Sequence, residues 1–370
     1  ESLAPFFERK PGFGPSVCVN PAGMQSCRPL ELAEIPGVIA QYAAAAVRAK
    51  EAGYDGIELH AAHAYMLLGS FLSPLRNARR DEYGGKTLET RARLLLETLE
   101  AVRAAVGPQF PITVSLSGYE RFPGGRAINE TQRLAQMLVA AGASAFRVSG
   151  GTTDSLVTAM VMSSDFPDAI NVAQAQAIRQ VVDVPVMVVG RIHTPEHAER
   201  ILAAGRADLI GMARPFLADP EWPNKARAGK ASQIRRCISC ENCIDSMRKA
   251  QNLNCAVNAA TGRELSYVLT PTAQRKHVVV IGGGPAGMEA ARVADLRGHR
   301  VTLLERQGRL GGSMLLASTV HAENEAFFQW LTQQVKDSSI DLRLGTEASA
   351  ELLFDLKPDA IVVATGARVA

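Results

Sequence analysis

The stretch GYDGIELHAAHAY, residues 53–65, decides how the rest of this sequence is interpreted. Its first part, 53–60, is a short run of strand-forming residues introduced by a turn-like Gly and Asp, which predicts a β-strand. His60 and His63 come at its end or directly after it. Because parallel α/β folds gather functional side chains at the carboxyl ends of their strands, these two residues are the first candidates for a site.

Further short β-branched runs repeat this pattern, each next to a segment with helical spacing of apolar residues. The alternation predicts an α/β fold, either an open doubly wound sheet or a (β/α)8 barrel. A barrel needs eight strands, and fewer precede the cysteine-rich segment described next. We expect strands at 53–60, 111–117, 145–150, 185–190 and 208–214, and helices at about 35–52, 88–106, 130–142, 171–182 and 195–204.

A second diagnostic stretch, CISCENC, places Cys237, Cys240 and Cys243 at regular intervals, and Cys255 follows. Three thiols at this spacing can hold three corners of a 4Fe–4S cluster while the fourth closes it. Zinc sites more often use two separated pairs, so a zinc clasp and incidental thiols stand as alternatives. Six cysteines in a chain of 370 residues are too few for a disulfide framework, which favours a reducing, cytoplasmic compartment.

After the cysteines, a polar segment at 263–276 reads as a linker. A β-branched run then ends at Gly282-x-Gly284-x-x-Gly287, a helical segment follows, and a second strand ends in Glu305. This is the dinucleotide fingerprint in its required context. The glycines permit a tight turn and close approach of a pyrophosphate, the helix N-terminus binds phosphate, and the glutamate accepts a hydrogen bond from a ribose hydroxyl.

FAD is favoured over NAD as the ligand of this fingerprint. The segments GGS (311–313) and DAIVVATGA (359–367) resemble the parts that complete the FAD-binding half of flavoproteins with two dinucleotide sites. We expect FAD contacts from Gly282, Gly284, Pro285, Ala286, Gly287, Glu305 and Gly312.

The segment HAAHAYMLLGSFLSPLRNARRDEYGG, residues 60–85, resembles the one that marks the Old Yellow Enzyme family of FMN-dependent ene reductases. Residues 188–202 and 207–225 resemble the last two barrel strands of that family. The cysteine segment resembles the iron–sulfur part of its long members, such as the 2,4-dienoyl-CoA reductases, the 2-enoate reductases and trimethylamine dehydrogenase. The resemblance implies the C-terminal part of a TIM-type barrel at 1–230, a cluster segment at 231–262, a linker at 263–276 and a partial Rossmann-like FAD domain at 277–370.

The resemblance also assigns roles around a substrate carbonyl. His60 and His63 are expected to donate N–H groups to the oxygen, as an oxyanion hole does when hydride transfer to the β-carbon develops negative charge there. Tyr65 matches the family's proton donor to the α-carbon, a general acid whose phenol stays protonated. The family usually has Gly where Ala64 precedes this tyrosine.

The FMN phosphate is expected at the ends of the last two barrel strands. By resemblance, Gly190, Arg191, Ala213 and Arg214 would hold it, since glycine permits close backbone approach and a guanidinium binds phosphate through two hydrogen bonds.

Two departures from the family pattern stand out. Ser115 occupies the position of an arginine that lies near the N1 and O2 edge of the flavin and stabilises its anionic reduced form. Either another charge substitutes, or reduced FMN is less stabilised, and we expect a lower flavin potential than in relatives with the arginine. The loop at 149–155 has no histidine, although some dienoyl-CoA reductases carry one there.

The expected activity is reduction of the C=C bond of an enone or enoyl-CoA thioester, with electrons from NAD(P)H passing through FAD, a 4Fe–4S cluster and FMN. An amine demethylase and an inactive relic are the alternatives. A net charge of +3 without basic runs argues against nucleic acid, and no apolar stretch reaches the roughly 18 residues of a membrane span. The sequence specifies no oligomeric state. The three barrel strands missing before residue 1 predict that the chain does not hold FMN stably by itself.

Overall fold

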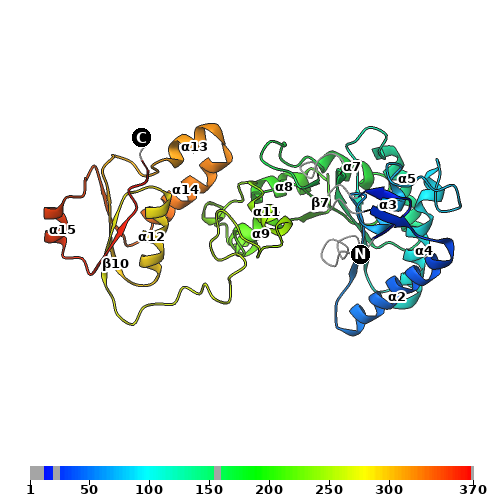
Figure 1. Ribbon diagram of the computed structural model, residues 1–370, viewed down its shortest axis with the longest axis horizontal. Helices are drawn as coiled ribbons and strands as arrows, with labels where there is room; N and C mark the ends of the chain where they lie inside the picture. The colour runs from blue at the N-terminus through cyan, green and yellow to red at the C-terminus, as the bar shows by residue number, and fades with distance from the viewer. Residues whose placement is uncertain (1–11, 20–25, 154–159, 368–370) are drawn as a thin grey trace. The chain divides into compact units, whose positions relative to one another are not determined.

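The computed structural model describes residues 12–19, 26–153 and 160–367 of the chain (Figure 1). The chain divides into two compact units, which are described separately here. The first comprises Glu1–Ile192 and Glu196–Met212, and the second comprises His193–Pro195 and Ala213–Ala370. Within the described ranges, no helix combines the length and apolar character needed to cross a bilayer.

The first unit is built on a parallel sheet with the strand order β4-β5-β6-β7-β8. All strands predicted from the sequence are confirmed, each somewhat shorter than expected. Their bounds are Ile57–Ala61 (β4), Ile112–Ser117 (β5), Ala145–Ser149 (β6), Val186–Val189 (β7) and Leu209–Gly211 (β8). The α/β class is therefore confirmed. Closure into an eight-stranded barrel stays a prediction, because the sheet in the described part of the chain has five strands.

The helices before and between these strands cover the sheet with apolar side chains, and α2, α4, α5 and α7 pack against one another in chain order (Figure 1). The predicted helices are confirmed as Ile35–Glu51 (α2), Leu88–Val106 (α4), Ile128–Ala140 (α5), Val172–Arg179 (α7) and Pro195–Ala203 (α8). A fully buried helix, Leu67–Leu72 (α3), and a small sheet were not predicted. The sheet has the order β1-β3-β2, with strands Gly12–Gly14, Ser26–Pro29 and Cys18–Val19, and η1 (Leu32–Glu34) follows it.

The second unit contains a parallel sheet with the order β11-β10-β9-β12, as expected for half of a Rossmann-like domain. Its strands are His277–Ile281 (β9), Arg300–Glu305 (β10), Asp341–Leu344 (β11) and Ala360–Val363 (β12), and its helices are Pro285–Leu296 (α12), Met314–Val320 (α13), Glu323–Lys336 (α14) and Ala350–Leu356 (α15). In this unit, short helices precede the sheet along the chain: Arg214–Ala218 (α9), Trp222–Arg227 (α10), Ala231–Gln233 (η3) and Asn242–Arg248 (α11). The expected linker, 263–276, forms neither helix nor strand.

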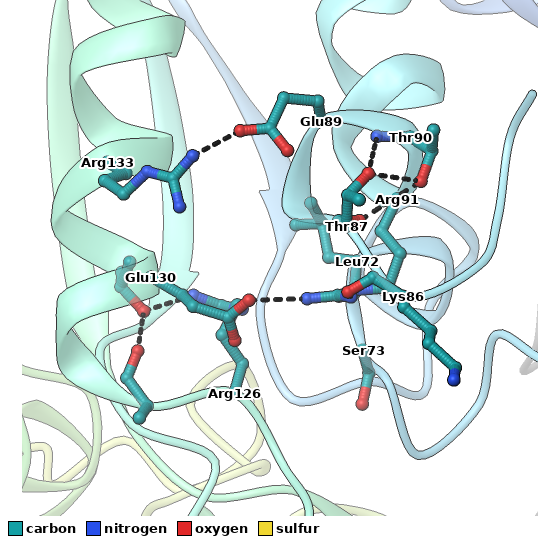
Figure 2. Close-up of polar contacts among 12 residues, drawn as sticks. Leu72, Ser73, Lys86, Thr87, Glu89, Thr90, Arg91, Arg126, Glu130 and Arg133 are labelled. Carbon is teal, nitrogen blue, oxygen red and sulfur yellow. Dashed lines mark hydrogen bonds and ion pairs between the residues drawn. The ribbon is translucent and has the colours of Figure 1, made fainter.

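A buried arginine on α4 ties three segments of the first unit together. The guanidinium of Arg91 donates to the carbonyl oxygens of Leu72 (3.1 Å) and Lys86 (2.9 Å) and forms an ion pair with Glu130 (2.7 Å). Its side chain is 3% exposed. Figure 2 shows this arrangement beside the outer pair of Arg133 with Glu89. Because the guanidinium satisfies two carbonyl groups and a carboxylate, its loss leaves three acceptors short of a partner.

We predict that Arg91→Leu lowers the free energy of unfolding by about 2–4 kcal/mol, since buried acceptors would lose their donor. Arg133→Leu is the matched control on the neighbouring helix. Both side chains of the Arg133 pair are more than half exposed, so its loss is expected to cost less than about 0.5 kcal/mol. Denaturant unfolding measures both values, and equal losses in the two variants would contradict the prediction.

Candidate functional site

The structure brings the three predicted catalytic residues together. His60 lies near the end of β4, and His63 and Tyr65 lie in the turn that follows. The ring centroids are 5.9 Å apart for the two histidines, 5.6 Å for His60 and Tyr65, and 6.2 Å for His63 and Tyr65. The three polar rings therefore form one cluster at the carboxyl edge of the sheet.

His60 bridges the tyrosine and the serine of the neighbouring strand. Its Nε2 lies 3.2 Å from the hydroxyl of Tyr65, and its Nδ1 lies 3.4 Å from the hydroxyl of Ser115 on β5. When the serine hydroxyl donates to Nδ1, the proton of the neutral imidazole lies on Nε2. Ser115 can thus set the tautomer in which His60 presents an N–H donor toward Tyr65.

His63 is held differently. Its Nδ1 lies 3.2 Å from the carbonyl oxygen of Gly151, and its backbone N–H donates to the hydroxyl of Ser117 at 2.8 Å. A carbonyl oxygen only accepts, so this contact places the proton of the neutral ring on Nδ1 and leaves Nε2 as an acceptor. In this arrangement the two histidines are complementary, one donor and one acceptor, whereas the sequence led us to expect two donors.

The turn that carries these residues has an unusual backbone. His63 (φ 66°) and Ala64 (φ 55°) both adopt the left-handed conformation. That conformation costs a residue with a side chain roughly 1–2 kcal/mol, and glycine adopts it freely. This explains why the family favours glycine at the position of Ala64, and the turn still brings the Tyr65 hydroxyl to 3.2 Å from Nε2 of His60.

Burial keeps the site uncharged near neutral pH. It lowers the pKa of His63 to about 4 and lowers the pKa of His60, and the positive charge of Arg147 lowers both further. Burial also raises the pKa of Tyr65 above its usual value, which Arg147 partly opposes. The imidazoles are therefore neutral and the phenol is protonated, as a proton-donating tyrosine requires.

The low pKa of His63 predicts a loss of stability in acid. The unfolded chain binds a proton at this residue below its unfolded pKa of about 6.5, while the folded chain does so only near pH 4. Stability is thus fully present above pH 6.5 and falls as the pH drops from 6.5 toward 4, by roughly 2–3 kcal/mol at pH 4.5. Urea unfolding from pH 7.5 to 4.5 should show a smaller loss in His63→Asn. An identical pH dependence in the variant would contradict this prediction.

The four predicted cluster ligands line one pocket in the second unit. Ser239 (φ 49°) and Glu241 (φ 60°) adopt the left-handed conformation between the cysteines, which wraps the loop around the pocket. The backbone N–H of Ser239 also donates to the sulfur of Cys237 at 3.4 Å. Left-handed residues with side chains carry a conformational cost and concentrate at functional sites. The remaining cysteines of this pocket are Cys240, Cys243 and Cys255.

The pocket places a buried cation beside the four thiols. In the described residues, no three His, Cys, Asp or Glu side chains are arranged to hold one metal ion. Arg214 lines the pocket, and its Nη1 is buried without a hydrogen-bond partner. Burial raises the pKa of the Cys237 and Cys243 thiols, and the charge of Arg214 opposes this. Four thiols with a buried cation beside them can hold an anionic group, either an iron–sulfur cluster or a zinc ion with four thiolates.

The expected FMN phosphate ligands are divided between the two units. In the first, Gly190 has φ 118°, and Arg191 is buried and pairs with Asp168 at 3.0 Å. In the second, Ala213 precedes α9, and Arg214 faces the cysteines. Their common role at one phosphate stays a prediction.

The glycine fingerprint has the geometry of a phosphate cradle. A Cβ on Gly287 would lie 1.8 Å from the carbonyl oxygen of Gly282, so only glycine allows the helix to pack this closely on the turn. A Cβ on Gly284 would meet nothing nearer than Gly312, at 4.0 Å, so the backbone here is open to a ligand. Gly284 precedes Pro285 and Ala286 at the start of α12, whose free N–H groups can bind phosphate.

Glu305 lies at the end of β10 as predicted, but it already has backbone partners. One carboxylate oxygen accepts from the N–H of Gly283 at 2.6 Å, and the other accepts from Gln307 at 2.8 Å. Each oxygen has a second lone pair, so contact with a ribose hydroxyl stays a prediction. The structure adds a role that the sequence did not suggest, because Glu305 fixes the glycine turn.

Comparison with known proteins agrees with this architecture. Residues 9–233 match the model of the NADH:flavin oxidoreductase / NADH oxidase family, and residues 276–370 match that of the pyridine nucleotide-disulphide oxidoreductases. The chain belongs to the NADH:flavin oxidoreductase / NADH oxidase family.

Individual relatives of this chain carry names that differ in what they act on. The N,N-dimethylglycine/sarcosine dehydrogenase of Chromohalobacter salexigens is 38% identical, with 96% of this chain and 52% of that protein covered. The cinnamate reductase of Clostridium sporogenes is 35% identical, with 92% and 54% covered. The structure of 2-naphthoyl-CoA reductase with 2-naphthoyl-CoA matches with a TM-score of 0.93 at 30% identity, covering 97% of this chain and 55% of that one. The chain thus spans about half the length of the curated relatives it matches.

Two charged residues near the rings were not predicted from the sequence. Arg147 on β6 and Glu58 on β4, two strands separated by β5, form an ion pair. Ser117, at the end of a predicted strand, orders the turn through His63 and Gly151. The sequence signal for this ion pair was a charged residue inside each of the apolar runs 53–60 and 145–150. It became interpretable only when the strand register was known.

Proposed function

We propose that this chain is part of an NAD(P)H-dependent flavoenzyme that reduces the C=C bond of an α,β-unsaturated carbonyl compound or an enoyl-CoA thioester. The observation that carries the proposal is the cluster of His60, His63 and Tyr65 at the carboxyl edge of the sheet. Relatives named cinnamate reductase and 2-naphthoyl-CoA reductase support this substrate class.

The site residues would divide the chemistry between a hydrogen-bond donor and an acid. His60, with its proton on Nε2, donates to the carbonyl oxygen on which negative charge develops. FMN, when bound, supplies the hydride to the β-carbon. Tyr65 donates its phenolic proton to the α-carbon, and its raised pKa keeps that proton available. His63 joins as a second donor when its Nδ1 releases Gly151 and the proton moves to Nε2.

We predict that Tyr65→Phe lowers the turnover of an enone such as 2-cyclohexenone by about 10²–10⁴-fold, the usual contribution of a general acid. Reduction of the bound flavin by NAD(P)H should be unchanged, because the phenol takes no part in it. Stopped-flow spectroscopy of the two half-reactions separates these effects. Tyr54→Phe is the control, since Tyr54 is exposed and outside the site. Oxidation by enone at the wild-type rate in Tyr65→Phe would exclude the assigned role.

Amine oxidation is the second candidate function, because His63 presents an acceptor nitrogen in its neutral form. An acceptor at this place suits the N–H of an amine better than a carbonyl oxygen. The relative named N,N-dimethylglycine/sarcosine dehydrogenase supports this alternative. Anaerobic flavin reduction by dimethylglycine, sarcosine or a methylated amine, together with no reoxidation by enones, would replace the C=C proposal with this one.

For the cysteine pocket we propose a 4Fe–4S cluster held by Cys237, Cys240, Cys243 and Cys255. Such a cluster supplies one-electron transfer between two-electron flavin sites when it is bound. The open backbone at Gly284 and the glycine turn around it would hold FAD, the flavin that exchanges electrons with FMN through the cluster.

We predict about four iron and four acid-labile sulfide per chain after anaerobic purification, and an EPR signal after dithionite reduction. Cys240→Ser should lower the iron content and alter the signal, because one corner loses its thiolate. Cys27→Ser is the control, since Cys27 lies in the small N-terminal sheet of the other unit. One zinc per chain without sulfide would instead assign a structural clasp to this loop.

A further inference from the structure

A row of polar side chains crosses the sheet of the first unit at one level. His60 on β4 pairs with Ser115 on β5, and Ser115 pairs with Arg147 on β6. Paired residues of a parallel sheet point to the same face, and the 3.4 Å contact between His60 and Ser115 confirms this for the first pair. Arg147 therefore projects from the same face as the catalytic rings.

The guanidinium of Arg147 lies over the strand that carries Ser115. Its Nε and Nη2 each donate at 2.6 Å to the carboxylate of Glu58, which stands on β4 two residues before His60. Strands β4 and β6 are separated by β5, a span of roughly 10 Å at about 4.8 Å per strand. A side chain from β6 that meets one from β4 must cross β5, so this cation lies over β5 between Ser115, the partner of Arg147, and Thr113, the partner of Glu58.

The small side chain at position 115 makes this crossing possible. An arginine there would project from the same stretch of β5 and place a second guanidinium beside the first. Ser115 leaves the space open and uses its hydroxyl on His60 instead. Positions 115 and 147 are thus related: β5 has a serine in place of the expected arginine, and the arginine of β6 extends across β5.

The charge of Arg147 acts on all three rings of the site. It lowers the pKa of His60, His63 and Tyr65. Among the described residues, Arg121 also lies near the rings; its charge lowers the pKa of His63, and its guanidinium binds Asn171 and the carbonyl oxygen of Ile170. Arg147 is therefore the better-placed charge for a group bound against this face.

We propose that Arg147 provides the positive charge at the N1 and O2 edge of FMN, reaching from β6 to the place that an arginine on β5 would occupy. Glu58 holds the guanidinium in this place through both oxygens. The inference rests on the proposed function, since it requires FMN on the carboxyl edge of this sheet. It replaces the expectation of a lowered flavin potential, because the charge has moved to the neighbouring strand.

The test measures the flavin itself in the polypeptide with its natural termini. Sulfite adds to oxidised FMN, and a cation at N1 stabilises the resulting negative charge. Arg147→Gln should weaken sulfite binding at least tenfold. It should also lower the two-electron midpoint potential of FMN, by about 30 mV for each tenfold loss of preference for the reduced form. The double variant Ser115→Arg with Arg147→Ser returns the cation to β5 and should recover both values.

Two controls locate the effect. Arg121→Gln removes a cation near His63 without touching the one over β5, and Arg133→Gln removes one from the outer face of α5. Both should change sulfite affinity less than threefold. An unchanged flavin potential in Arg147→Gln would overturn the inference, and so would an equal change of potential in Arg121→Gln. If the potential is unchanged and the KM for carboxylate substrates rises tenfold, Arg147 binds the substrate and not the flavin. Wild-type protein that binds FMN but reduces no enone would refute the proposed function. The FMN potentials of the wild type and Arg147→Gln would then still show whether Arg147 provides the charge at N1.

Discussion

The register between β4 and β5 is the constraint on which the first unit's site depends. It sets His60 beside Ser115, and the next pairing sets Ser115 beside Arg147. A slip of one residue would send each of these side chains to the opposite face of the sheet. The register is held by apolar residues between the polar ones, such as Leu59, Val114 and Val148, which are buried in the core. Packing of the apolar face against the helices thus fixes which polar side chains lie on the other face.

The turn after β4 brings His63 and Tyr65 beside His60. Two consecutive left-handed residues reverse the chain so that Tyr65 returns to His60, and the hydroxyl of Ser117 holds the turn by its backbone. The left-handed conformation of Ala64 costs stability, and the packed surroundings must compensate for it. Burial then sets the protonation states, with neutral imidazoles and a protonated phenol.

In the second unit, too, unusual backbone conformations shape the candidate sites. In the cysteine loop, left-handed residues between the thiols turn four separated cysteines toward one pocket. In the dinucleotide fingerprint, the two glycines have different roles. Gly287 allows the helix to pack closely on Gly282, and Gly284 leaves the backbone open to a ligand. Glu305 connects the fingerprint to the end of β10 through the N–H of Gly283. Both sites are therefore shaped mainly by the main chain.

The sequence by itself determined the α/β class, the order of the strands along the chain and most members of the candidate sites, because these depend on local periodicity and on spacing between nearby residues. His60, His63 and Tyr65 lie within six positions, and three of the four cysteines lie within seven. Only the tertiary structure decided the proton positions of the histidines and the place of Arg147. The partners of these groups, Gly151, Ser115 and Glu58, are 55 to 89 residues away and are brought near only by strand pairing. Local pattern carries no information on which distant strand lies alongside, and that pairing is what positions the charge.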